Sequence, residues 1–180
     1  MRLTLLSFLA ALVLAAPLHA QNDEQDWCRV AIMADSSGDP ATAVEAYSHC
    51  LETPGLEDEY RGMFLHQRGL AYEALGEPEN AVEDFTQALP LVLEPEKTFS
   101  ARGLARAQMG QFDKAIYDFT QAINVNPHEP GNWHMRGILN IEVGHFDEAL
   151  DDYDMAVSLA PDNVMLLAGR AELKARMGDR

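Results

Sequence analysis

The chain has 180 residues, of which 47% are hydrophobic. This length is enough for one folded domain. Its 29 acidic and 13 basic side chains give a formal net charge of −16. Phosphate groups repel so acidic a surface, so we expect no binding to nucleic acid or to an anionic membrane surface.

The first 20 residues have the pattern of a secretory signal peptide. Arg2 precedes an apolar segment at 5–16, Pro17 follows it, and the small residue Ala20 comes just before Gln21. The apolar segment is too short for a stable membrane anchor, although an uncleaved anchor is the alternative. We therefore expect cleavage after Ala20 and an exported protein of residues 21–180, with no membrane insertion after cleavage.

The rest of the chain repeats with a period of 34 residues. When each unit is numbered so that its glycine is position 8, the units are 24–57, 62–95, 96–129 and 130–163, with a remnant at 164–180. Position 8 holds Ala31, Gly69, Gly103, Gly137 and Ala171; position 15 holds Gly38, Gly76, Gly110, Gly144 and Gly178. Position 20 holds Ala43, Ala81, Ala115 and Ala149; position 24 holds Tyr47, Phe85, Phe119 and Tyr153. A fixed period with small and aromatic residues at set offsets predicts stacked helical hairpins.

Each unit is expected to form two helices of about 14 residues joined by a turn at position 15. Glycine there can adopt the left-handed conformation that ends a helix. Asp39, Asp113 and Asp147 follow these turns, where a carboxylate suits the start of the second helix. Pro127 and Pro161 end the second helices of the last two units.

These columns resemble the tetratricopeptide repeat, over residues 24 to 180. The motifs are "RGLAYEALGEPENAVEDFTQAL", "RGLARAQMGQFDKAIYDFTQAINVNP" and "RGILNIEVGHFDEALDDYDMAVSLAP". The resemblance implies an all-α fold, a right-handed α-solenoid of about four helix-turn-helix repeats with a C-terminal capping helix. The first unit departs most from the pattern, as terminal repeats often do. The remnant is interpreted as the capping helix, with Leu167 and Ala171 facing inward.

Cys28 lies on the first helix and Cys50 on the second helix of the same expected hairpin. Packed helices bring facing Cα atoms to roughly 5 Å, which is within disulfide range. We therefore predict a structural Cys28–Cys50 disulfide; a redox-active pair is the alternative, which no CxxC spacing supports.

From the second unit on, position 7 is arginine, and position 23 of each complete unit is aspartate. The arginines are Arg68, Arg102, Arg136 and Arg170, and the aspartates are Asp84, Asp118 and Asp152. Arg170 has no second helix of its own, so we expect pairs between neighbouring units, Asp84–Arg102, Asp118–Arg136 and Asp152–Arg170. Pairing within units is the alternative. In either case these charges are structural.

No catalytic or metal-binding pattern is present. The histidines form no metal-ligand spacing, and no serine lies in a GxSxG context. We therefore expect a protein that is not an enzyme, with no cofactor and no metal.

In tetratricopeptide proteins the first helices line a concave groove that holds a peptide. Carrying these positions over gives Arg29, Ile32, Asp35, Met63, His66, Leu70, Glu73, Lys97, Ser100, Leu104, Gln108, His134, Met135, Ile138 and Glu142. One subclass grips acidic tails with lysine and asparagine side chains; its positions here hold His66, Leu70 and Ala101, and only Lys97 matches. The resemblance therefore implies a partner segment with apolar anchors and basic flanks rather than an acidic tail.

The leading interpretation is a monomeric adaptor that binds another protein, exported to the periplasm of a Gram-negative bacterium. The first alternative is a structural subunit of a cell-envelope assembly that docks by its convex or terminal surfaces. An envelope enzyme or its regulatory subunit is a third.

Overall fold

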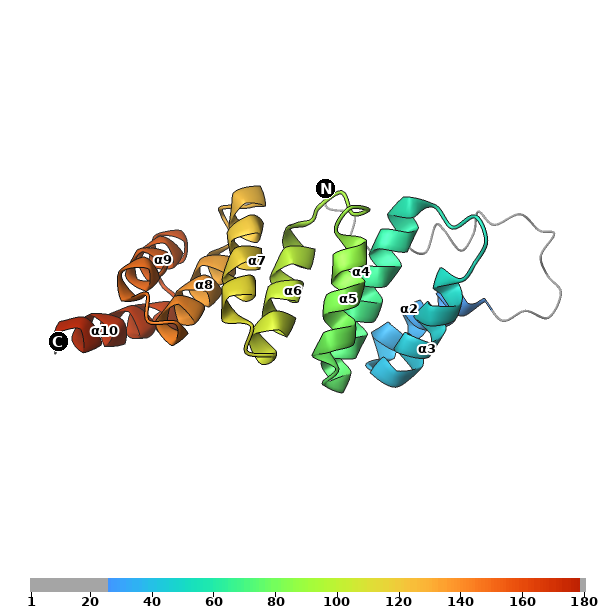
Figure 1. The fold of residues 1–180 in the computed structure, drawn as a ribbon, viewed down its shortest axis with the longest axis horizontal. Coiled ribbons are helices and arrows are strands. Elements are labelled where there is room, and N and C mark those ends of the chain that lie inside the picture. Colours follow the sequence, from blue (N-terminus) through green and yellow to red (C-terminus); the bar gives the residue numbers. More distant parts are fainter. Residues whose placement is uncertain (1–25, 179–180) are drawn as a thin grey trace.

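The computed structural model describes residues 26–178, and this part of the chain is helical with no strand (Figure 1). The expected signal peptide at 1–20 lies outside the described residues. The helices are α2 (Trp27–Ser37), α3 (Pro40–Leu51), α4 (Asp58–Leu75), α5 (Pro78–Ala88), α6 (Glu96–Gln108), α7 (Phe112–Val125), α8 (Pro130–Glu142), α9 (Phe146–Leu159) and α10 (Val164–Gly178).

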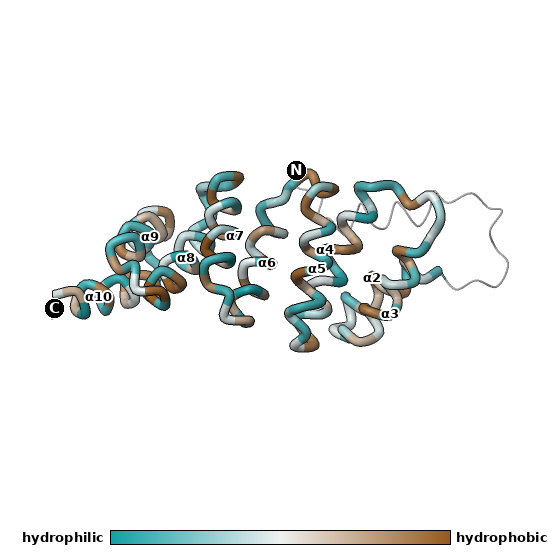
Figure 2. The backbone as a smooth tube through the Cα atoms, viewed as in Figure 1, coloured by the Kyte–Doolittle hydropathy of each residue, from teal (hydrophilic) through white to brown (hydrophobic). Residues whose placement is uncertain are grey.

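The helices form a series of antiparallel hairpins, in which α2 pairs with α3, α4 with α5, α6 with α7, and α8 with α9. Each hairpin packs on the next, and α10 packs on α9 at the C-terminal end (Figure 1). The fold is the expected right-handed α-solenoid. Hydropathy alternates along the helices (Figure 2), as amphipathic helices packed on one side require. None of the helices in residues 26–178 is both long and apolar enough to cross a membrane.

The turns within hairpins depend on glycine at position 15. Gly38, Gly76, Gly110 and Gly144 all have φ between 70° and 85°, the left-handed region that side chains with a Cβ disfavour. The second helix of the first hairpin is capped by Asp39, whose carboxylate accepts a hydrogen bond from the Thr42 backbone N–H.

The small residue at position 8 allows close contact between the two helices of a hairpin. A Cβ built on Gly69 would lie 2.6 Å from a ring carbon of Phe85, so no larger residue fits there without movement. A Cβ on Gly103 would lie 3.0 Å from a ring carbon of Phe119, and one on Gly137 would lie 3.3 Å from a ring carbon of Tyr153, so these contacts are close but less severe. The aromatic rings and the alanines at position 20 are buried and form the core of each hairpin.

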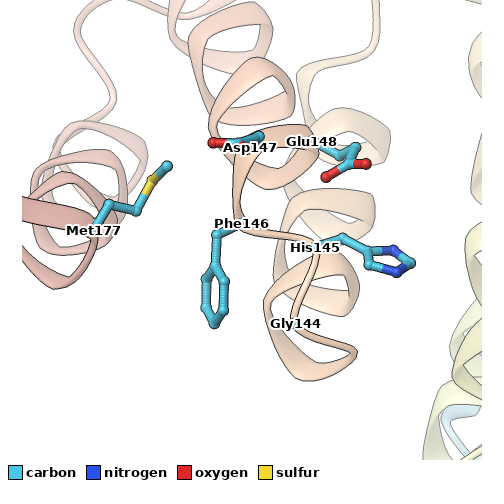
Figure 3. A pocket seen from close by; sticks show the side chains of 6 residues that line it. All are labelled: Gly144, His145, Phe146, Asp147, Glu148 and Met177. Carbon is cyan, nitrogen blue, oxygen red and sulfur yellow. The ribbon is translucent and has the colours of Figure 1, made fainter. Parts of the chain in front are cut away.

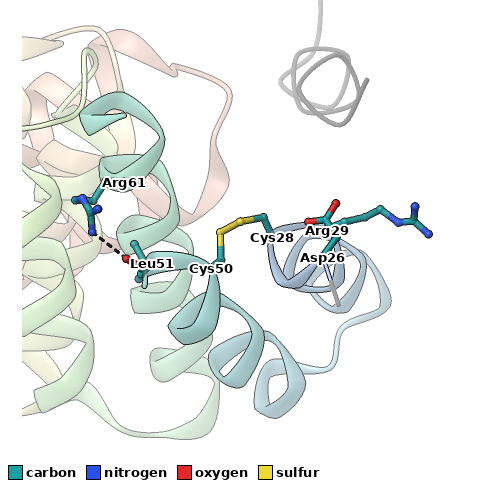
Figure 4. Close-up of a disulfide and its surroundings, with 6 residues drawn as sticks. All are labelled: Asp26, Cys28, Arg29, Cys50, Leu51 and Arg61. Atoms are coloured by element: carbon teal, nitrogen blue, oxygen red, sulfur yellow. Dashed lines mark hydrogen bonds between the residues drawn. A yellow bond between two sulfur atoms is a disulfide. The ribbon is translucent and has the colours of Figure 1, made fainter. Parts of the chain in front are cut away.

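The first hairpin is joined covalently. The structure links Cys28 and Cys50 by a disulfide, with their Cα atoms 4.8 Å apart (Figure 4). Just beyond it, Arg61 of α4 donates a hydrogen bond to the Leu51 backbone carbonyl. Helix α4 begins at Asp58, four residues before the expected unit boundary, and its extra turn contacts the end of α3 through this bond.

The arginine–aspartate pairs form within units, so the expected pairing between units is wrong. Arg102 donates from Nε and Nη2 to the two oxygens of Asp118, at 3.1 and 2.8 Å. Arg68–Asp84 and Arg136–Asp152 are bound in the same two-pronged way. The reason is geometric: a residue on a first helix lies beside the residue sixteen positions later, on the second helix of its own hairpin. We call each such pair an Arg–Asp rung.

Each rung also reaches the preceding hairpin. The remaining guanidinium nitrogen, Nη1, donates to a hydroxyl at position 25 of the unit before. The bonds are Arg68 to Ser48, Arg102 to Thr86 and Arg136 to Thr120, at 3.0 to 3.1 Å. The rungs therefore connect three helices and help to fix the stacking of the hairpins.

Helix α10 faces the solenoid differently from the sequence-based expectation. Leu166 and Leu173 are buried against the preceding hairpin, whereas Leu167 and Ala171 are exposed. Leu167 and Ala171 hold positions 4 and 8, which in earlier units are covered by the second helix of the same unit. No such helix follows α10 among the described residues, so these positions stay open.

Candidate partner-binding face

The first helices α2, α4, α6 and α8 are joined by hydrogen bonds from one to the next. Gln67 of α4 donates to Asp35 of α2 at 3.3 Å. The Thr98 hydroxyl lies 3.0 Å from His66 Nδ1, and Ser100 donates to Asn132 of α8 at 2.7 Å. These bonds hold the first helices side by side as one surface, which we call the first-helix face.

Two leucines at position 9 form the apolar centre of this face. Leu70 is 40% exposed and Leu104 is 38% exposed; Met33 of α2 and Leu75 of α4 are also exposed, at 61% and 40%. Ile32 and Ile138 hold the same position in the outer units and are partly buried. Among the residues at position 9, the exposed ones therefore lie on α4 and α6, in the middle of the solenoid.

Two methionines expected on this face are partly buried and also contact the core. Met63 packs against the cluster around Tyr47 and Phe64, and Met135 packs against Phe119 and Leu139. Their unit positions, 2 and 6, differ from the position 9 that carries the exposed leucines. Both methionines therefore offer less surface to a partner than the exposed leucines.

Position 5 is used for contacts between helices. His66 is half-buried, and its hydrogen bond with Thr98 occupies one ring nitrogen. Burial, together with the charge of Lys97, lowers the pKa of His66, so the ring is neutral at pH 7. Burial also lowers the pKa of His134, whose ring contacts Tyr153 edge-on. The Ser100 hydroxyl donates to Asn132. The residues at position 5 therefore mainly hold neighbouring helices together and are less available to a partner.

Glu73 is the acid of this face with an unsatisfied charge. Its side chain is half-buried, and among residues 26–178 its carboxylate has neither a hydrogen bond nor an ion pair. Burial raises its pKa to about 7. Asp35, at the same position of the first unit, instead accepts hydrogen bonds from Tyr47 and Gln67, although burial still raises its pKa. Glu73 is therefore ready to accept a cation.

The other expected residues lie at the margins. Arg29, Lys97, Gln108 and Glu142 are exposed, and each lies on a first helix. Arg29 lies on the first hairpin near the disulfide (Figure 4). The structure thus brings Leu70, Glu73 and Leu104 to the centre, with the polar residues around them.

Sequence reasoning missed the residues that align the first helices. Thr98 and Asn132 both hold position 3 and are almost fully buried, at 2% and 4% exposure. Asn132 also donates to Glu96 at 3.0 Å. A polar residue recurring at position 3 of two adjacent units was the available signal, because buried polar side chains need partners.

A hollow at the C-terminal end offers no comparable site. It is lined by the α8–α9 turn and by Met177 of α10, and its side chains point in different directions (Figure 3). No group of three or more potential metal ligands occurs in residues 26–178. The side chains around this hollow therefore form no catalytic or metal-binding group.

Comparison with known proteins agrees with the repeat pattern. The tetratricopeptide repeat family model matches residues 64–90 and 97–129. No curated protein matches the chain in sequence.

Solved structures resemble it in fold. MamA (41-end) from Desulfovibrio magneticus RS-1 is 17% identical, with a TM-score of 0.76 over 85% of this chain and 84% of that one. A tetratricopeptide repeat protein from Parabacteroides merdae is 20% identical, with a TM-score of 0.77 over 87% and 62%. The first TPR of Spaghetti (RPAP3), bound to the HSP90 peptide SRMEEVD, is 19% identical, with a TM-score of 0.64 over 68% and 97%.

Identities this low show the fold alone, and the family model identifies the repeats. The units that carry Leu70, Glu73 and Leu104 are therefore tetratricopeptide repeats, and the chain is a solenoid of that fold.

Proposed function

We propose that this protein is a non-catalytic adaptor that binds a segment of another protein on its first-helix face. The observation that carries the proposal is the combination of two exposed leucines with one half-buried acid that lacks a partner, all on α4 and α6. Exposed apolar side chains around a polar group that needs a partner are typical of binding surfaces. A structure of similar fold was solved with a peptide bound.

The chemistry of the face defines the segment. Leu70 and Leu104 would take two apolar anchors, and Glu73 would take a lysine or arginine. An acidic tail fits poorly, because the chain is acidic overall and lacks the lysine and asparagine set that holds such tails. A basic residue beside Glu73 would stabilise its ionised form, so binding should weaken as the pH falls below 7.

The test is capture of partners from an envelope extract of the source organism. The purified protein is compared with a double variant of the face, Leu70→Asp with Leu104→Asp, and with a matched variant of the second helices, Tyr117→Asp with Met155→Asp. Tyr117 and Met155 are 57% and 41% exposed, so both double variants should fold. A partner lost only with the first variant supports the adaptor; a partner lost with neither contradicts it.

A second candidate is a structural subunit of an envelope assembly that docks by the second helices. Tyr117, Val125 and Met155 favour it, because these large apolar side chains are 41% to 57% exposed on α7 and α9. A partner lost only with the Tyr117→Asp, Met155→Asp variant would select this function.

The proposed location is outside the cytoplasm, with the periplasm of a Gram-negative bacterium as the first choice. The signal-like pattern of residues 1–20 supports export, and a disulfide is stable in such a compartment. The mass of the protein purified from its source tests this: cleavage after Ala20 is expected, and an intact N-terminus in the cytoplasmic fraction would contradict it.

A further inference from the structure

One face of α10 is exposed, and the equivalent face of each earlier first helix packs against the second helix of its own hairpin. Val164 and Leu167 are 77% and 36% exposed, and Ala171 and Ala175 continue the same stripe in exposed positions. The opposite side of α10 is packed on the solenoid through Leu166 and Leu173. The open stripe therefore continues the interface between first and second helices beyond the last complete hairpin.

The α6–α7 hairpin shows what this face binds when it is filled. Asp118 of α7 is fully buried and is held by two cations of α6, Arg102 at position 7 and Arg106 at position 11. Phe119, the next residue of α7, covers Gly103. An aspartate followed directly by an aromatic residue is thus the pair that the face receives, and the same order occurs at Asp84–Phe85 and Asp152–Tyr153.

Helix α10 carries the same two cations at the same unit positions, Arg170 at position 7 and Lys174 at position 11. Arg170 donates from Nη1 to Asp154 of the preceding unit at 3.1 Å, which corresponds to the bond from Arg102 Nη1 to Thr86. The nitrogens that hold Asp118 in the α6 hairpin, Nε and Nη2, have no hydrogen bond in Arg170 among residues 26–178. Lys174 Nζ lies 3.8 Å from the same Asp154 oxygen, so the free donors of the carboxylate site are Nε and Nη2 of Arg170.

Position 8 of α10 is alanine rather than glycine, and this is compatible with a covering helix. Ala31 holds the same position in α2 and is completely buried in the cluster that contains Tyr47 of α3. The charge also fits: α10 carries Arg170, Lys174 and Arg176 against Glu172, in a chain whose net charge is −16. A basic end of this kind favours an acidic helix.

We infer that the open face of α10 binds an acidic amphipathic helix of a partner protein. An aspartate of that helix accepts hydrogen bonds from Nε and Nη2 of Arg170, and the aromatic residue after it packs on Ala171 and Leu167. This site lies at the C-terminal end of the solenoid and is separate from the first-helix face, so the protein has two docking surfaces.

The probe is a labelled peptide with the sequence of residues 144–161, which contains α9, the helix that the equivalent face of α8 holds. It is titrated into the full chain and followed by fluorescence anisotropy. Saturable binding is expected. Arg170→Gln in the protein, or Asp152→Asn in the peptide, should weaken binding by about tenfold or more, since a charge-assisted bidentate pair is lost.

Two further variants make the test specific. Ala171→Glu should abolish binding, because it places a like charge and extra volume where the aromatic residue packs; Ala171 is exposed, so the fold should be retained. Lys114→Gln removes one positive charge from the exposed side of α7 and should leave binding unchanged.

Absence of saturable binding overturns the inference, as does binding that Arg170→Gln and Ala171→Glu leave unchanged, which would mean that the peptide enters another hairpin. If the chain instead self-associates without binding peptide and Ala171→Glu abolishes the association, the occupant is a second copy and the partner helix is excluded.

Discussion

The first hairpin and the three that follow it join their two helices by different chemistry. In α2–α3 the link is the Cys28–Cys50 disulfide, and the positions of the rung hold Val30 and Ala46. In the later hairpins the link is an Arg–Asp rung. The disulfide acts within one hairpin, whereas each rung also reaches the hairpin before it. The comparison indicates that the end unit is stabilised internally and the middle units are stabilised by stacking.

The largest effect is expected from breaking the central rung with Asp118→Ala. Asp118 has no exposed surface, and its loss leaves the guanidinium groups of Arg102 and Arg106 buried without their carboxylate. Removing one partner of a buried ion pair costs about 3–5 kcal/mol of unfolding free energy. Chemical denaturation measures it, with the exposed Asp113→Ala in the same helix as a control that should cost about 1 kcal/mol or less. Equal losses in the two variants would refute the structural role of the rung.

Removing the disulfide with the double variant Cys28→Ala and Cys50→Ala should cost about 3 kcal/mol, because the bond closes a loop with a sequence separation of 22 residues. The loss should be confined to the first hairpin. Hydrogen exchange should therefore quicken in α2 and α3 while α6–α9 stay protected. Uniform loss of protection along the chain would show that the first hairpin is not an independent end unit. Two free thiols in the protein as purified under non-reducing conditions would refute the bond itself.

Glu73 lies on α4, in the hairpin between the first hairpin and α6–α7, and it makes the stability of the protein depend on pH. Its pKa in the folded chain, about 7, is higher than the ordinary value of 4.5, so folding favours the protonated form. The stability it contributes is present below pH 4.5 and is lost as the pH rises through 7. Glu73→Gln should therefore raise the melting temperature at pH 8 and change it little at pH 4. A lower melting temperature at pH 8 would mean that the carboxylate has a stabilising partner.

The smallest effect is expected for Arg170→Ala at the open end. Its single bond joins Asp154, whose side chain is 49% exposed, and exposed pairs contribute about 1 kcal/mol or less. Arg136→Ala, the same change in a closed rung, should cost about 3 kcal/mol or more. Thermal denaturation of the two variants side by side makes the comparison. Similar losses would show that Arg170 is already in a closed rung.

The sequence predicted the hairpins well, because a small residue such as Gly69 paired with an aromatic residue such as Phe85 recurs wherever two helices approach closely. It did not fix the direction of the rungs, since Asp118 could in principle meet Arg102 or Arg136. Leu167 and Ala171 were misplaced because their positions are buried only when a second helix of the same unit covers them. On the binding face, Leu70 and Leu104 follow from position 9, but the lack of a partner for Glu73 depends on packing that spacing does not reveal.

The central claim is that the first-helix face, centred on Leu70, Glu73 and Leu104, binds the partner segment. Hydrogen exchange of the protein with and without its captured partner tests this most directly. The account predicts new protection in α4 and α6, with α5, α7 and α9 unchanged. Protection confined to α7 and α9 would contradict it and place the interface on the second helices.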